Sequence, residues 1–79
     1  MAGIFKTDTI ELRKIMAEKE IKTTKELSEK SGINRNTLAS VLNGTSQPSS
    51  DVMEKLVFAL EIEPEKAGNI FFKHNLRAT

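Results

Sequence analysis

The chain has 79 residues, which make one small domain and exclude a large barrel, a doubly wound sheet or a two-domain enzyme. It contains no cysteine, so a disulfide framework, a thiolate zinc site and a cysteine nucleophile are excluded. Twelve basic and eleven acidic residues give a net charge of +1, a balance that does not by itself indicate a nucleic-acid binder. No apolar run approaches the ~20 residues of a membrane span, and we expect a cytoplasmic protein of one domain, residues 1–79.

The charges are unevenly spread along the chain. Residues 19–44 carry five basic and three acidic side chains, whereas residues 45–66 carry two basic and five acidic ones. Such a charge dipole can orient a domain towards a polyanion. A mixed, solvated surface explains the same distribution equally well.

The pattern predicts an all-α domain of five helices, because apolar residues recur at helical spacing and never alternate with polar ones over a useful length. The first helix is expected over about 8–20. Asp8 and Glu11 stand at the spacing of a capping box, in which each end satisfies an orphan amide of the first turn. One face of this helix is apolar and is expected in the core: Leu12, Ile15 and Met16.

Two short helices follow and are joined by a tight turn. The second helix, about 24–31, opens after Thr23 and stops at Gly32, a residue that adopts the left-handed conformation without a Cβ penalty. The third helix, about 35–42, opens after Asn34, which is a good N-cap. The apolar anchors of this unit are Leu27, Ile33, Leu38, Val41 and Leu42, and Asn43-Gly44 stops the third helix.

A polar loop containing Pro48 leads to the last two helices. Ser49 or Ser50 is expected to cap the fourth helix, whose core residues are Val52, Met53, Leu56, Val57 and Leu60. Pro64 is tolerated in the first turn of a fifth helix, expected over about 64–73.

The third helix has an apolar back and a polar front. Arg35, Asn36 and Thr37 fill its first turn, and Ser40 lies one turn further on, also facing outward. An anchored helix with a hydrogen-bonding front suits the DNA major groove, where arginine can take two acceptors of guanine and asparagine can pair doubly with adenine.

The run from residue 23 to residue 44 resembles the helix-turn-helix of the phage-repressor (Cro and CI, lambda-repressor-like) family. The loop at Pro48-Ser49 and the apolar residues of the fourth helix match the continuation of that pattern, so the resemblance covers roughly residues 8–62. It implies a five-helix, lambda-repressor-like DNA-binding domain with its helix-turn-helix core at about 23–44. It departs from the family at Thr24, where a glutamine usually opens the second helix, and at Ser28, usually alanine.

The resemblance implies that the start of the third helix reads bases and that neighbouring residues meet the DNA backbone. Each residue also has a structural alternative: Asn34 as a helix cap, Asn43 as a helix stop, and the others as polar surface. The expected DNA-binding set is Thr24, Lys25, Asn34, Arg35, Asn36, Thr37, Ser40, Asn43 and Thr45.

The tail, about 64–74 and the residues after it, is the second notable feature. Phe71 and Phe72 are adjacent, so one helix cannot bury both on the same face. We expect one of them to meet a partner; the alternative is that both pack on the core. The expected partner interface consists of Ile70, Phe71, Phe72 and Leu76, and serves a homodimer or a heteromer with a phage repressor.

These observations predict a sequence-specific transcription regulator of the Cro/CI type, bound to a double-stranded DNA operator in a phage lysis–lysogeny switch within the bacterial host cell. Because net charge +1 leaves few phosphate contacts, the alternative is a modulator or anti-repressor that acts by binding the phage repressor. A third possibility is an antitoxin-like regulator. No enzyme, cofactor, metal or small-molecule substrate is expected, since no catalytic motif stands out and His74 is the only histidine.

Overall fold

The computed structural model describes residues 5–74. Five helices account for most of them: α1 (Thr9–Glu18), α2 (Thr24–Ser31), α3 (Arg35–Leu42), α4 (Ser50–Leu60) and α5 (Pro64–Phe71). The expected all-α, five-helix fold is therefore confirmed, and α2 and α3 have the bounds that the sequence predicts.

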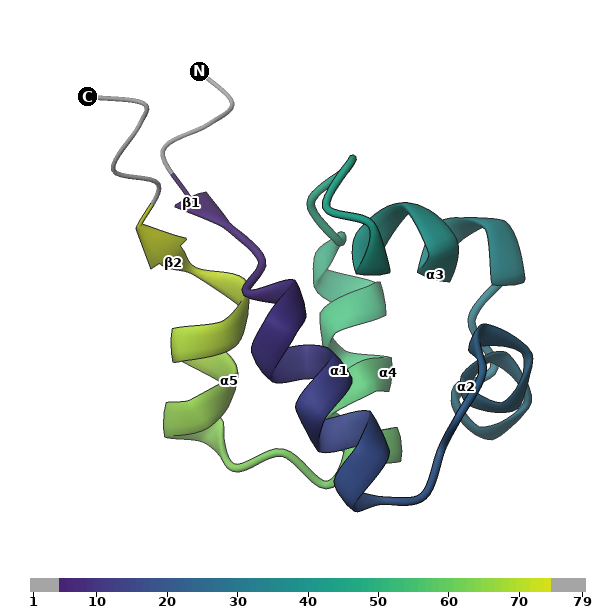
Figure 1. Cartoon of the computed structure of the whole chain (residues 1–79). Helices are drawn as coiled ribbons and strands as arrows, with labels where there is room; N and C mark the ends of the chain where they lie inside the picture. The colour runs from purple at the N-terminus through teal and green to yellow at the C-terminus, as the bar shows by residue number, and fades with distance from the viewer. Residues whose placement is uncertain (1–4, 75–79) are drawn as a thin grey trace.

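The first and last helices are shorter than expected. Helix α1 begins after Asp8, which is its N-cap, and ends at Glu18. Helix α5 ends at Phe71, because the chain then extends into a two-residue strand, β2 (Lys73–His74), that pairs antiparallel with β1 (Phe5–Lys6). This short ladder, which the sequence pattern did not predict, brings the two ends of the described chain together (Figure 1).

Side-chain caps begin four of the five helices. Asp8 Oδ1 accepts from the Glu11 N–H at 3.1 Å, and Thr23 Oγ1 accepts from the Glu26 N–H at 3.1 Å. Ser49, rather than Ser50, caps α4 through the Val52 N–H at 3.3 Å. These short-range bonds satisfy amides that a helix leaves unpaired at its start, which is why the sequence alone predicts the helix starts closely.

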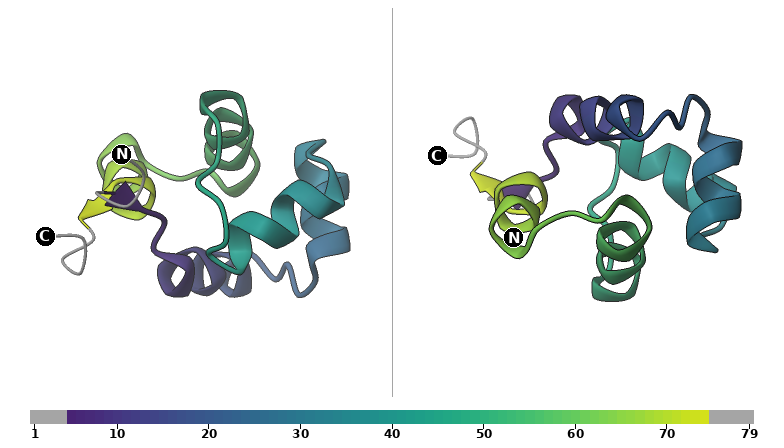
Figure 2. Two further views of the ribbon diagram at one scale, coloured as in Figure 1. Left: turned by 90° about the horizontal axis from the view of Figure 1, so that it is seen from above. Right: turned by 90° about the horizontal axis from the view of Figure 1, so that it is seen from below.

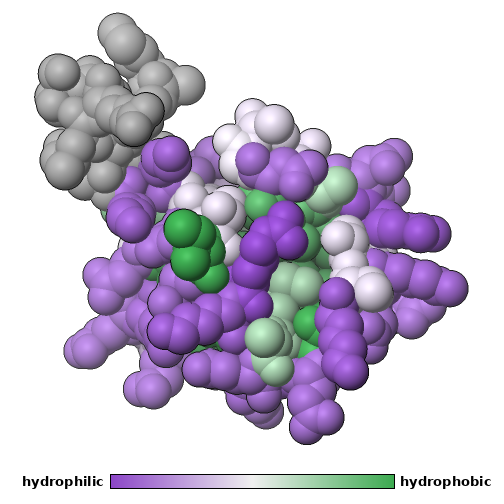
Figure 3. Space-filling model, in the orientation of Figure 1, coloured by the Kyte–Doolittle hydropathy of each residue, from purple (hydrophilic) through white to green (hydrophobic). Residues whose placement is uncertain are grey.

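Helices α1 and α4 lie between α5 on one side and the α2–α3 pair on the other (Figures 1 and 2). Hydrophilic side chains cover most of the face seen in Figure 3, with apolar areas between them. The core takes side chains from every helix, and its most deeply buried members are Leu12, Leu27, Leu38, Val41, Leu56, Leu60, Ile70 and Phe71.

A polar connection ties three distant segments together. Thr7, which is buried, donates from its hydroxyl to Gln47 Oε1 at 3.0 Å. Gln47 Nε2 in turn donates to the carbonyl of Phe71. The loop between α3 and α4 is therefore bonded both to the start of the chain and to the end of α5.

Candidate nucleic-acid interface

The bend between α2 and α3 is fixed by local hydrogen bonds and one glycine. Gly32 has a φ of +78°, in the left-handed region, where an L-residue costs roughly 1–2 kcal/mol more. Its N–H donates to the Ser28 carbonyl at 2.8 Å, and the Ser28 hydroxyl donates to the Ile33 carbonyl at 2.6 Å. Ile33 is buried, so it seats the bend on the core. The two short helices therefore meet at Gly32, where the sequence predicts the turn between them.

Helix α3 has a buried back and an exposed front. Its inner face is held in the core by Leu38, Val41 and Leu42. Arg35 and Asn36 are exposed, and none of their side chains folds inward. The expected orientation of the helix is thus confirmed, while contact with DNA stays a prediction for each of these residues.

Asn34, Thr37 and Ser40 differ in their exposure and in whether their side chains already form hydrogen bonds. Asn34 Oδ1 accepts from the Asn36 N–H at 2.8 Å and from the Thr37 N–H at 3.4 Å, so its cap role is confirmed and its amide NH₂ is left as the donor. Thr37 is exposed, whereas Ser40 is half-buried. Of the predicted reading residues, Ser40 is the least accessible.

The end of α3 is closed by two side chains from outside the helix. The Thr45 hydroxyl donates to the Ser40 carbonyl at 3.0 Å, which gives Thr45 a capping role beside its predicted one. Arg13 Nη2, from α1, donates to the Leu42 carbonyl at 3.1 Å and to Asn43 Oδ1 at 3.4 Å. A cation at a helix C-terminus interacts favourably with the helix dipole.

Sequence reasoning missed Arg13. It lies 29 residues before Leu42, and no local pattern connects an arginine on one helix with the end of another. Its contact also occupies the side-chain oxygen of Asn43, so the exposed Asn43 has its NH₂ group as the remaining donor.

The start of α2 contributes the two remaining predicted residues. Thr24 is half-buried at the first position of α2, and Lys25 is exposed next to it. Because α2 packs against α3, these residues belong to the same end of the molecule as the polar front (Figures 1 and 2). The predicted DNA-binding residues thus come from one continuous unit, α2, α3 and the turn after α3.

The predicted partner interface on the tail needs a correction. Ile70 and Phe71 are each only 1% exposed, because both point into the core, so neither offers surface to a partner. Phe72 is 52% exposed, which confirms that only one of the two adjacent phenylalanines is buried. Leu76 lies outside the described residues.

Other kinds of site find little support in the described part of the chain. Over residues 5–74 no group of three or more His, Cys, Asp or Glu side chains is placed to hold a metal ion. Among the same residues, no helix has the length and apolar content to cross a membrane. The pKa of Asp8 is lowered, chiefly by the Glu11 N–H, and the pKa of Glu61 is lowered, chiefly by its hydrogen bond with Lys19; neither carboxyl lies on α2 or α3.

Comparison with known proteins adds one match. A family model described as the Cro/C1-type HTH DNA-binding domain matches residues 11–66. The match includes α2, the bend at Gly32 and all of α3, and it stops within α5. No curated protein and no solved structure shows significant similarity to the chain.

Proposed function

Because the chain belongs to the family of Cro/C1-type HTH DNA-binding domains, we propose that it is a sequence-specific regulator of transcription that inserts α3 into the major groove of DNA. The observation that carries the proposal is the exposed polar front of α3 over its buried back. The major groove of B-DNA is about 12 Å wide and admits one helix, whose N-terminal residues meet the base edges.

The contacts follow from the chemistry of each side chain. Arg35 suits a guanine, whose two acceptors match the guanidinium fork, and Asn36 suits an adenine. Thr37 supplies a hydroxyl to either kind of base. Lys25 and the NH₂ group of Asn43 suit phosphate oxygens, which fix the position of the protein but carry little sequence information.

A single α3 buries little DNA, so we propose that two copies act on a two-fold operator. The resemblance to phage repressors supports a place in the lysis–lysogeny switch of a temperate phage, in the cytoplasm of its bacterial host. Phe72, half-exposed at the end of α5, is the residue of the predicted partner interface that supports pairing of copies or pairing with the phage repressor.

The test begins with selection of duplexes from a random library by the purified protein. Binding of the selected duplex is then measured by fluorescence anisotropy at several salt concentrations. Arg35→Ala should lose about 1–3 kcal/mol of binding free energy, roughly 5- to 150-fold, and should relax the preference at one base pair. Lys25→Ala should instead weaken binding to all duplexes alike and reduce the salt slope by about one.

Lys55→Ala is the matched control, since it removes one positive charge from α4 rather than from the α2–α3 unit. It should leave the base preference unchanged. Selection of no preferred sequence, or a preference that survives Arg35→Ala intact, would refute the proposal that α3 reads bases.

A second candidate function is favoured by the acidic stretch after α3. Residues 45–66 carry five carboxylates against two lysines. The DNA phosphate backbone attracts positive charge, so this negative stretch does not favour contact with it. We propose, as the alternative, a modulator that binds the phage repressor and changes its action on the operator. The two candidates separate in a footprinting experiment with a phage repressor on its operator, with and without this protein. A changed repressor footprint, with no binding of the operator by this protein alone, would support the alternative over direct DNA reading.

A further inference from the structure

Phe58 is the most exposed large apolar side chain among the residues that the structure describes. It is 87% exposed, although it lies in the last turn of α4, whose other large apolar residues are buried or half-buried. Exposed apolar residues scattered singly are ordinary, but this one borders a hollow on each side. A groove of about 810 Å³ lies over α4, between the end of α2 and α5, and a second hollow of about 560 Å³ lies towards Lys19 and Glu61.

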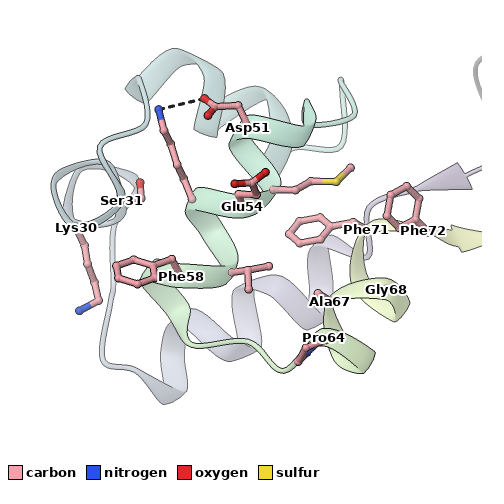
Figure 4. A pocket seen from close by; sticks show the side chains of 13 residues that line it. Lys30, Ser31, Asp51, Glu54, Phe58, Pro64, Ala67, Gly68, Phe71 and Phe72 are labelled. Carbon is pink, nitrogen blue, oxygen red and sulfur yellow. Dashed lines mark ion pairs between the residues drawn. The ribbon is translucent and has the colours of Figure 1, made fainter.

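The larger groove has an apolar floor and two walls (Figure 4). Met53 and Val57 of α4 and Ala67 of α5 are half-buried in it, and Phe72 borders it at the end of α5. Lys30 and Ser31, at the end of α2, form the opposite side, where the ring of Phe58 lies beside Lys30 (Figure 4). A groove between helices with an apolar floor is the usual receptor for an amphipathic helix.

Gly68 is the second observation, and it is independent of Phe58. A glycine inside a helix costs roughly 0.5–1 kcal/mol relative to alanine. Nothing in the described fold requires it, because its φ is not left-handed and a Cβ built there meets no atom within 4 Å. Gly68 lines the groove, so its missing side chain lowers the groove wall and lets another backbone approach closely.

The charged side chains around the groove indicate which kind of helix would bind there. The carboxylates of Glu54, in the groove, and of Glu63 and Glu65, on either side of Pro64, have no ion pair within residues 5–74. Asp51 is paired with Lys55 at 3.1 Å, so Lys30 is the one lysine of the groove lining that has no ion pair within residues 5–74. In a pair of copies joined through this face, the three unpaired carboxylates of each copy would find only one unpaired groove lysine, Lys30, on the other, and such an excess of like charge is unfavourable at interfaces.

We propose that the α4–α5 groove, which consists of Met53, Glu54, Val57, Phe58, Ala67 and Gly68, is a docking site for an amphipathic helix of another protein. That helix places apolar side chains around Phe58 and carries lysines or arginines on its flanks. The groove meets the α2–α3 unit only at the end of α2 and includes no residue of α3, so the proposal stands whether α3 reads DNA or not.

The probe is a phage-displayed library of amphipathic helices, panned on the wild-type protein after depletion on Phe58→Asp. We expect clones with apolar residues at positions i, i+4 and i+7 and an excess of Lys and Arg beside them. Synthetic peptides from those clones should bind at least tenfold more weakly to Phe58→Asp. Gly68→Gln, which places a side chain in the groove, should weaken binding to a similar degree.

Two controls make the outcome decisive. Ile10→Asp removes an apolar residue that is 80% exposed on α1, outside the groove, and should leave peptide binding unchanged. Arg35→Ala should also leave it unchanged, which separates this proposal from DNA reading. Circular dichroism of each variant checks that the fold is retained.

Three results would overturn the proposal. The first is the absence of any Phe58-dependent clone, and the second is enrichment of acidic rather than basic flanks. The third is self-association that sedimentation detects in the wild-type protein and that Phe58→Asp abolishes, since the occupant would then be a second copy.

Discussion

Helices α3 and α5 each have eight residues, yet they differ in how much of their attachment is local, although α3 also receives one distant bond, from Arg13 to the Leu42 carbonyl. Helix α3 begins with a side-chain cap from Asn34 and ends with a bond from Thr45 five residues beyond Ser40. Helix α5 has no side-chain cap at its start, and its end is fixed by groups that lie far away in the sequence. The comparison shows that hydrogen bonds from nearby residues can fix both ends of a helix while its exposed face stays free to bind a ligand.

The attachment of α5 comes from three places in the chain. The Asp8 N–H donates to the Ile70 carbonyl at 2.6 Å, and Gln47 donates to the Phe71 carbonyl. Lys66 and Glu11 form an ion pair at 3.5 Å. Both helices bury side chains in the core, Leu38, Val41 and Leu42 on α3 and Ile70 and Phe71 on α5. What differs is that the hydrogen bonds and the ion pair that hold α5 come from distant segments, whereas α3 also has local side-chain bonds at both of its ends.

The strongest test of this comparison is Phe71→Ala. We expect it to lower the free energy of unfolding by about 3–5 kcal/mol, because a fully buried aromatic ring is replaced by a cavity. Equilibrium unfolding in urea gives the value. Phe72→Ala, the half-exposed neighbour, is the control and should cost clearly less. Equal losses would mean that the two rings do not differ in burial.

The next test removes the long-range polar tie. Gln47→Ala should lower the free energy of unfolding by about 1–3 kcal/mol, because the buried Thr7 hydroxyl and the Phe71 carbonyl both lose their hydrogen-bond partner. Hydrogen exchange should report the loss of protection in α5 before α3. Ser46→Ala, at the neighbouring exposed position, should change neither quantity. Loss of protection in α3 first would contradict the described role of Gln47.

A cap substitution probes α3 from its own side. Asn34→Ala should cost about 1 kcal/mol, since the N–H groups of Asn36 and Thr37 lose their acceptor. Here hydrogen exchange should quicken in the first turn of α3 while α5 stays protected. Asn34→Asp keeps an acceptor and should restore most of the stability. A uniform loss of protection over both helices would show that α3 is not held locally.

The smallest effect concerns the charge of Asp8, which caps α1 and lies 3.3 Å from Lys73 Nζ. The Glu11 N–H above all, and Lys73 in addition, lower the pKa of Asp8 from 3.8, and partial burial opposes them. Because the pKa is lower in the folded state, this stabilisation is present above 3.8 and is lost as the pH falls through the folded pKa.

Asp8→Asn keeps the cap and removes the charge, so it isolates that contribution. We expect it to cost about 0.3–1 kcal/mol at neutral pH, the size typical of a charge at a helix start. The difference from the wild-type protein should shrink towards zero in acid, as thermal unfolding at a series of pH values would measure. A difference that persists in acid would assign the effect to the cap instead of the charge.

The sequence by itself determined the all-α fold, the bounds of α2 and α3, the bend at Gly32 and the exposed front of α3. Each of these depends on neighbours within about five residues: a cap, a left-handed glycine, or apolar residues at helical spacing. For Phe71 and Phe72 the sequence left open whether one ring or both are buried, and the packing of the helices decided that Phe71 alone is.

Only the tertiary structure decided the features that join distant segments. Arg13 at the end of α3, Gln47 between Thr7 and Phe71, and the pairing of β1 with β2 all link residues 24 or more positions apart. The same holds for the groove around Phe58, whose walls come from three helices. Periodicity shows which face of a helix is apolar, but the packing of the other helices decides how much of that face is covered.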